Sequence, residues 1–138
     1  MQIRQITPRY SVSPQINPED LAAIKAAGFV KVICNRPDEE IPPSHHAATM
    51  QSAAEAAGLE FFNLPLTHQT MTPQNITAQF AAVDCCDGPV LAYCASGTRC
   101  TVIWALSQAG SMPVDEILGT AQRAGYDLSG LRPRLVQP

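Results

Sequence analysis

The sequence predicts an α/β fold with a mainly parallel central sheet flanked by helices. Short apolar stretches alternate with helical patterns along most of the chain, which is typical of parallel sheets. The segments between most successive strands are long enough to hold the crossover helix that parallel pairing requires. The twelve prolines fall between the apolar segments, where they mark turns. Helices should therefore cover both faces of the sheet, and ligands should bind beyond the carboxyl ends of the strands.

The first half of the chain is expected to contain alternating short strands and helices. The run Asn17-Pro18-Glu19-Asp20 combines a capping residue, an early proline and acidic side chains, and these features start a helix. Gly28 can end that helix, and Ser44 is expected to cap a second helix that Gly58 stops. Strands are expected at residues 3–6, 10–13, 29–34 and 60–64, and helices at residues 17–28 and 44–57.

The second half continues the same pattern. Thr72-Pro73 starts a helix with Ile76, Phe80 and Val83 on one face. Gly88-Pro89 then turns the chain into a buried strand at residues 90–93, and a helix follows that is apolar on most sides. A last long helix is expected after residues 111–113 and ends at Gly125, with one short turn in the remaining tail.

Length and composition predict one globular domain over residues 1–138. Hydrophobic residues make up 46% of the chain and charged residues 15%, which is enough apolar surface for a core. The net charge of -3 gives no support for nucleic-acid or anionic-membrane binding. No stretch approaches the ~20 apolar residues of a membrane span, and residues 1–10 lack the apolar core of a signal peptide. We therefore expect a cytoplasmic protein.

The cysteines indicate neither a disulfide framework nor a metal site. Their number is odd, no Cys-x-x-Cys spacing occurs, and the adjacent pair His45-His46 has no partner motif. The sequence therefore predicts no metal and no other cofactor. The five cysteines are Cys34, Cys85, Cys86, Cys94 and Cys100.

The segment around Cys94 carries the strongest chemical signal. It joins an apolar strand to an apolar helix through Ala95, Ser96, Gly97 and Thr98, and Arg99 follows. Glycine lets the backbone curl close to an anion, and the N–H groups of such a loop, with the helix start, bind an oxyanion and lower the pKa of a nearby thiol. The two hydroxyls can steady the loop, and the guanidinium can grip two oxygens. We expect Cys94 to be an ionised nucleophile.

Three other residues are weaker candidates. His68 lies in a loop without carboxylates, at residues 65–70, and an imidazole, which ordinarily titrates near pH ~6.5, could donate a proton there. Arg36 follows a parallel strand, so it faces the Cys94 end and helps bind an anion, or it pairs with Glu39 or Glu40 and orders its own loop. Cys100 could trap an oxidised Cys94 as a disulfide, unless helix geometry forbids it.

Three segments together resemble the bacterial beta-lactamase-hydrolase-like family, a set of small phosphatase-like domains. The segments are residues 32–40 (VICNRPDEE), 91–99 (LAYCASGTR) and 124–128 (AGYDL), and the likeness covers residues 3–131. The resemblance implies a fold similar to the dual-specificity phosphatases. It also implies that Cys94 is the nucleophile, Arg99 the oxyanion clamp and residues 95–98 the phosphate cradle. Some family members are labelled sulfur transferases, and some are fused to a metallo-beta-lactamase-type domain.

The chain departs from the phosphatase pattern in three places. Tyrosine phosphatases have one residue more between the cysteine and the arginine, whereas the spacing seen here is frequent in rhodaneses. The position after the arginine, commonly Ser or Thr, is Cys100, and the loop that usually supplies an aspartic acid contains His68 instead. We expect a cysteine-dependent phosphatase acting on a small anionic substrate. The alternatives are a sulfurtransferase that carries a persulfide on Cys94, with a sulfane sulfur donor as substrate, and a non-catalytic anion-binding module.

Overall fold

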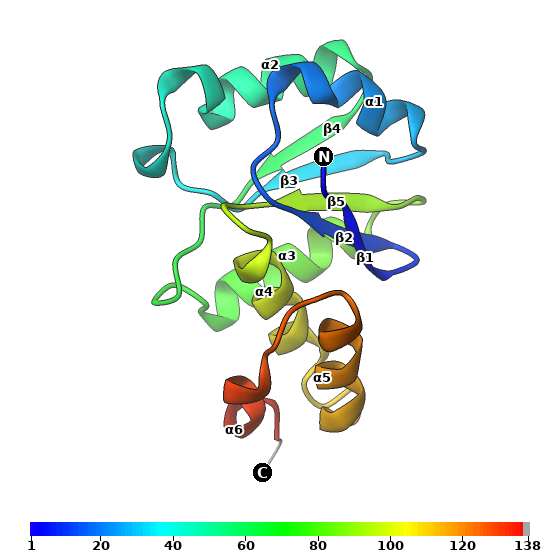
Figure 1. Ribbon diagram of the computed structural model, residues 1–138, viewed down its shortest axis with the longest axis vertical. Coiled ribbons are helices and arrows are strands. Elements are labelled where there is room, and N and C mark those ends of the chain that lie inside the picture. The colour runs from blue at the N-terminus through cyan, green and yellow to red at the C-terminus, as the bar shows by residue number, and fades with distance from the viewer. Residues whose placement is uncertain (137–138) are drawn as a thin grey trace.

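A computed structural model describes residues 1–136 and shows a five-stranded sheet with the strand order β1-β2-β5-β3-β4 (Figure 1). Strands β2, β5, β3 and β4 run parallel, and only β1 pairs antiparallel, with β2. The prediction of a mainly parallel sheet is confirmed. The strands are β1 (Arg4–Thr7), β2 (Tyr10–Ser13), β3 (Lys31–Cys34), β4 (Glu60–Asn63) and β5 (Val90–Tyr93).

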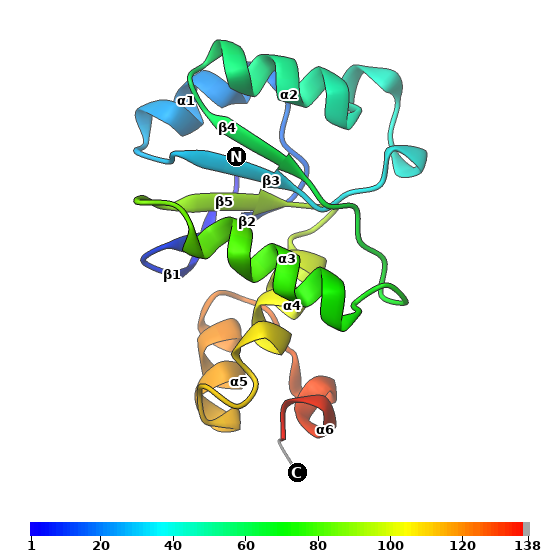
Figure 2. The ribbon, with the colours of Figure 1, turned by 180° about the vertical axis from the view of Figure 1, so that it is seen from behind.

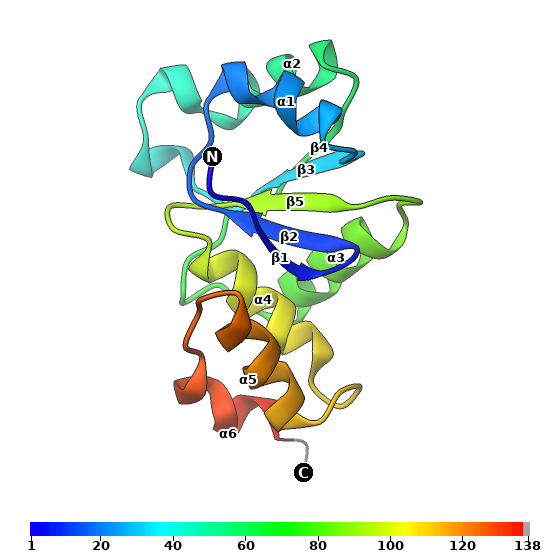
Figure 3. The ribbon, with the colours of Figure 1, turned by 45° about the vertical axis from the view of Figure 1, so that its right-hand side comes forward.

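Helices cover both faces of the sheet, as the alternation predicts. Helices α1 and α2 lie on one face, while α3 and α4 lie on the other, which Figure 2 shows from behind. Helices α5 and α6 lie beyond α4 and contact it from the outside (Figure 3). The helices are α1 (Leu21–Ala26), α2 (Ala47–Ala56), α3 (Pro73–Asp84), α4 (Thr98–Gln108), α5 (Val114–Arg123) and α6 (Arg132–Leu135).

Alternate residues of the central strand β5 belong to two separate cores. Val90, Ala92 and Cys94 pack on the side of α3 and α4, whereas Leu91 and Tyr93 pack on the side of α1 and α2. This is the period of two that a β-strand imposes. All four residues of β5 are fully buried, which explains why the strand reads as continuously apolar.

Helix α4 is surrounded on all sides, because the sheet covers it from one direction and α3, α5 and α6 from the others. Its residues from Arg99 to Leu106 are all buried. A helix without a polar face needs such an environment, so the expectation from its sequence is confirmed. Within residues 1–136, no helix is long and apolar enough to cross a membrane.

The start of α2 differs from the prediction. Ser44 does not cap the helix, since it lies in a short 3₁₀ turn at Pro43–His45, and α2 begins at Ala47. Asp38, from the preceding loop, accepts a hydrogen bond from the backbone N–H of Ala47 at 2.8 Å instead. The extended backbone of His46 (φ −61°, ψ 157°) separates the 3₁₀ turn from the helix and occupies the N-cap position.

Candidate functional site

Cys94 lies directly after β5, where the chain passes into helix α4. Because Tyr93 faces α1 and α2, the next side chain points the other way, toward the N-terminus of α4. The sulfur is fully buried at the base of the loop formed by residues 95–98, which we call the cradle.

The cradle holds Cys94 in its ionised form. The backbone N–H of Gly97 donates to the sulfur at 3.1 Å. The pKa of Cys94 falls from an ordinary value near 9 to about 5, chiefly through a hydrogen bond from the Cys100 thiol, with further backbone N–H bonds from Cys100, Ser96 and Gly97. Burial opposes this shift and is outweighed. At neutral pH, Cys94 is a thiolate, which is the nucleophilic form.

Cys100 takes the position that a hydroxyl residue commonly occupies after the arginine. Burial raises the pKa of its thiol well above the ordinary value, and the neighbouring Cys94 raises it further. Cys100 therefore stays protonated and donates to its ionised neighbour. The hydroxyl of the next residue, Thr101, donates to Gly97 O at 2.8 Å and so helps to hold the cradle in place.

Gly97 and Tyr126 set the shape of the cradle. Gly97 has φ +92°, a left-handed conformation that side chains rarely adopt, and a Cβ there would overlap the Tyr126 hydroxyl. That hydroxyl donates to Ser96 O at 3.0 Å, so the C-terminal segment supports the loop. The Ser96 hydroxyl accepts from the Thr98 backbone N–H at 3.3 Å, as expected for a residue that steadies the turn.

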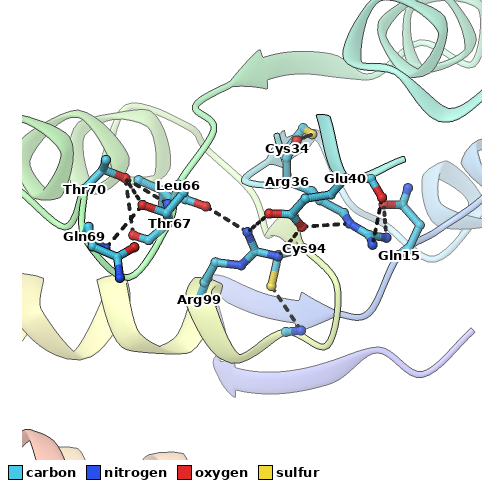
Figure 4. A network of polar contacts seen from close by, with 11 residues as sticks. Gln15, Cys34, Arg36, Glu40, Leu66, Thr67, Gln69, Thr70, Cys94 and Arg99 are labelled. Atoms are coloured by element: carbon cyan, nitrogen blue, oxygen red, sulfur yellow. Dashed lines mark hydrogen bonds and ion pairs between the residues drawn. The ribbon is translucent and has the colours of Figure 1, made fainter. Parts of the chain in front are cut away.

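Arg99 is held along one edge of its guanidinium, as Figure 4 shows. The Glu40 carboxylate accepts two hydrogen bonds of 2.8 Å, one from NH1 and one from NH2, and Leu66 O accepts from NH1 at 2.9 Å. These bonds use both NH1 hydrogens and one NH2 hydrogen. The side edge, made of Nε–H and the second NH2 hydrogen, remains for acceptors near Cys94. An arginine edge of this kind can bind two oxygens of a tetrahedral anion.

Arg36 pairs with Glu40, which is one of the two roles that the sequence predicts for this arginine. Its Nε donates to the Glu40 carboxylate at 3.2 Å, and its NH1 donates to Gln15 Oε1 at 3.2 Å. The two arginines together hold the pKa of Glu40 below its ordinary value, with Arg99 the larger cause. Arg36 therefore positions the carboxylate that positions Arg99.

The cradle opens into a hollow of about 360 Å³, which we call the cradle pocket. Its walls bring together residues that lie far apart in the sequence. His68 is exposed at this pocket, and its loop contributes no carboxylate. In the part of the chain that the structure describes, no three His, Cys, Asp or Glu side chains lie close enough to hold a metal ion. The pocket is lined by Glu40, Thr67, His68, Gln69, Ala95, Ser96, Thr98 and Arg99.

Glu40 and Tyr126 are the site residues whose roles the sequence did not reveal. Glu40 entered the sequence analysis only as a partner of Arg36, because its contact with Arg99 spans 59 positions. Tyr126 lies 30 positions from Ser96, so no local pattern joins the two. Both occur in segments that carry the family resemblance, and that is the one signal that could have marked them.

Comparison with known proteins places this chain in a family. The model of the phosphatase-like domain of beta-lactamase hydrolase-like proteins matches residues 2–111. The chain belongs to this family. A beta-lactamase hydrolase-like protein of Xylella fastidiosa (strain Temecula1) is 33% identical over 130 residues, which is 93% of this chain. The chain spans only 30% of that relative's length.

Solved structures support the same assignment. A candidate phosphatase (nma1982) from Neisseria meningitidis superposes with a TM-score of 0.86 and 35% identity, over 98% of this chain and 96% of its own. TpbA of Pseudomonas aeruginosa, crystallised with pTyr, superposes with a TM-score of 0.58 and 15% identity, over 97% of this chain and 90% of its own. The second similarity concerns the fold alone. The fold is of the dual-specificity-phosphatase type, as the resemblance implied.

Proposed function

We propose that this domain is a cysteine-dependent phosphatase that hydrolyses small phosphate monoesters. One observation carries the proposal: the ionised sulfur of Cys94 lies beneath the cradle N–H groups, next to the open edge of Arg99. The sulfur supplies the nucleophile, and the guanidinium and amides supply charge stabilisation. Membership of a phosphatase-like family supports the same chemistry.

The reaction would proceed in two displacements at phosphorus. The Cys94 thiolate forms a sulfur–phosphorus bond while the ester oxygen leaves with the electron pair of the broken phosphorus–oxygen bond and takes up a proton. Water then attacks the phosphocysteine, which releases inorganic phosphate and restores the thiolate. In both steps Arg99 and the cradle N–H groups bind the equatorial oxygens, where charge accumulates in the transition state.

We propose His68 as the side chain that protonates the leaving oxygen. It lines the cradle pocket, whereas Glu40, the carboxylate there, is kept ionised by two arginines and is a poor proton donor. A positioned acid contributes roughly 10²–10⁴-fold to such a step. Since an exposed loop histidine is less firmly positioned than a buried acid, we expect aryl phosphates, with good leaving groups, to react faster than alkyl phosphates.

The spacing between Cys94 and Arg99 favours sulfur transfer as a second candidate. A cradle one residue shorter than in tyrosine phosphatases suits a smaller guest. In this reaction Cys94 would displace sulfite from thiosulfate and carry the outer sulfur as a persulfide. A thiophilic acceptor such as cyanide would then take the sulfur atom and leave the thiolate.

One pair of assays separates the candidates. The wild-type protein and Cys94→Ser are given an aryl phosphate, and separately thiosulfate with cyanide. Phosphate release that depends on Cys94 is the expected result. Thiocyanate formation that depends on Cys94 would favour the sulfurtransferase instead. Silence in both assays would contradict both enzymes and leave an anion-binding module.

A further inference from the structure

A second hollow lies beside the cradle pocket and has a volume of about 290 Å³. We call it the side pocket. Its apolar wall consists of Met71, Val102, Leu128 and Leu131, and two charged side chains, Asp127 and Arg134, also line it. The proposed displacement at phosphorus uses none of these residues. Their combination of an apolar surface and charged groups is typical of a ligand site.

Three observations show that the side pocket continues from the cradle pocket. His68 lines both of them. Thr98 lines the first and Val102 the second, and residues four apart lie on the same face of a helix, one turn from each other. Asp127 follows Tyr126, whose hydroxyl is bonded to the cradle. A substrate held by its phosphate at the cradle can therefore extend along α4 into the side pocket.

The two charged side chains differ in how they are held. Asp127 accepts a hydrogen bond from the backbone N–H of Ser129 at 3.0 Å, and its contacts with Ser129 lower its pKa. Arg134 donates from NH2 to Met71 O at 3.4 Å, a long bond that a better acceptor can replace. The arginine is therefore the group better able to turn toward a ligand. Its charge favours an anionic ligand.

We propose that the side pocket binds the leaving group of the substrate, and that this group is an aromatic ring bearing a negative charge at its far end. The inference rests on the proposed phosphatase function. The phosphate would occupy the cradle, the ring would contact Val102 and Leu128, and the distal anion would meet Arg134. The ester oxygen would then lie between the two pockets, where His68 can reach it.

The test compares three aryl phosphates: phenyl phosphate, 4-carboxyphenyl phosphate and 4-(aminomethyl)phenyl phosphate. We expect kcat/KM to favour the carboxylate over phenyl phosphate, and Arg134→Gln to reduce this ratio about three- to tenfold, since the arginine is partly screened by solvent. Comparing ratios between proteins cancels the intrinsic reactivity of each ester. Arg132→Gln is the matched control, because Arg132 lies on the same helix but pairs with Asp115 at 2.7 Å. It should leave the ratio unchanged, and salt should weaken the preference.

Other outcomes distinguish the possible failures. If the kcat/KM ratio is the same in the wild type and Arg134→Gln, and turnover is intact, the proposed role of the side pocket is contradicted. The phosphatase proposal is unaffected by that result. A preference for the ammonium ester would assign the pocket to cations through Asp127 and overturn the anionic assignment. If no ester is turned over, the phosphatase proposal fails. Binding of the same three esters to Cys94→Ser by calorimetry then decides the side pocket alone, supported by an Arg134-dependent preference and overturned by its absence.

Discussion

Cys34 and Cys94 lie at the carboxyl ends of two neighbouring parallel strands, and both are fully buried, yet their ionisation is opposite. The pKa of Cys34 is raised, chiefly by burial, whereas that of Cys94 falls to about 5. Cys34 pairs in register with Tyr93, one residue before Cys94. One step along a strand therefore separates a protonated thiol from an ionised one.

The difference comes from what each sulfur faces. Cys34 points toward α1 and α2, and its thiol donates to the carbonyl of Arg36 at 3.4 Å. Cys94 points toward the start of α4, where the Cys100 thiol and backbone N–H groups donate to it. Burial penalises the thiolate in both places, and only converging donors reverse that penalty. A position at the end of a strand is therefore not sufficient to ionise a thiol at this edge of the sheet.

The largest effect should come from removing one sulfur or the other. We expect Cys94→Ser to lower phosphate release from an aryl phosphate by at least about 10⁴-fold, because the nucleophile is lost. Cys34→Ser should leave the rate within a few-fold of wild type. Steady-state rates on the same ester provide the measurement. Comparable losses of rate in both variants would contradict the assignment of different roles to the two thiols.

A pH titration sharpens the comparison without any substrate. The ultraviolet absorbance of thiolates should show one group ionising near pH 5 in the wild type and none there in Cys94→Ser. Because folding lowers this pKa from near 9, the thiolate's contribution to stability is complete above pH 9 and is lost as the pH falls toward 5. The stability of the wild type relative to Cys94→Ser should decline over the same range in denaturant titrations.

Changing the conformation of the cradle should shift the pKa of Cys94 in the direction of that of Cys34. Gly97→Ala forces a side chain into a left-handed conformation and against Tyr126, so we expect a loss of about 1–3 kcal/mol in unfolding free energy. The pKa of Cys94 should rise toward its ordinary value. Gly130→Ala is the control, since a Cβ there meets nothing within 4 Å. Thermal unfolding of both variants measures the difference, and equal melting temperatures would argue against a strained cradle.

The smallest effect should follow from releasing Arg99. Glu40→Gln removes the carboxylate that fixes one edge of the guanidinium, and we expect kcat/KM to fall about tenfold through misplacement. Because both arginines lower the pKa of Glu40, the uncharged amide should also lower the stability of the protein modestly. Kinetics with an aryl phosphate check this expectation. An increase in activity would instead identify Glu40 as a competitor for the anion site.

Local sequence patterns were sufficient to predict the sheet, most helices and the cradle. A continuous apolar run after Gly88-Pro89 predicted β5, a second apolar stretch predicted α4, and Gly97 between Cys94 and Arg99 marked the loop. The contacts that orient the cradle were beyond such patterns, since Glu40 reaches Arg99 from a different strand end. The start of α2 was missed because Asp38, nine positions before Ala47, accepts the bond from the first turn that was expected to involve Ser44. Contacts between residues far apart in the sequence decide these details, and a single sequence does not reveal such contacts.

The even register of the parallel strands has a consequence for how this scaffold can vary. Tyr10, Lys31 and Val90 align across β2, β3 and β5, and their strands end level with one another without a bulge. Inserting one residue within β5 would advance the nucleophile by about 3.3 Å and turn it to the opposite side of the sheet. The number of residues in β5 therefore determines both the depth of Cys94 and the side of the sheet that it faces.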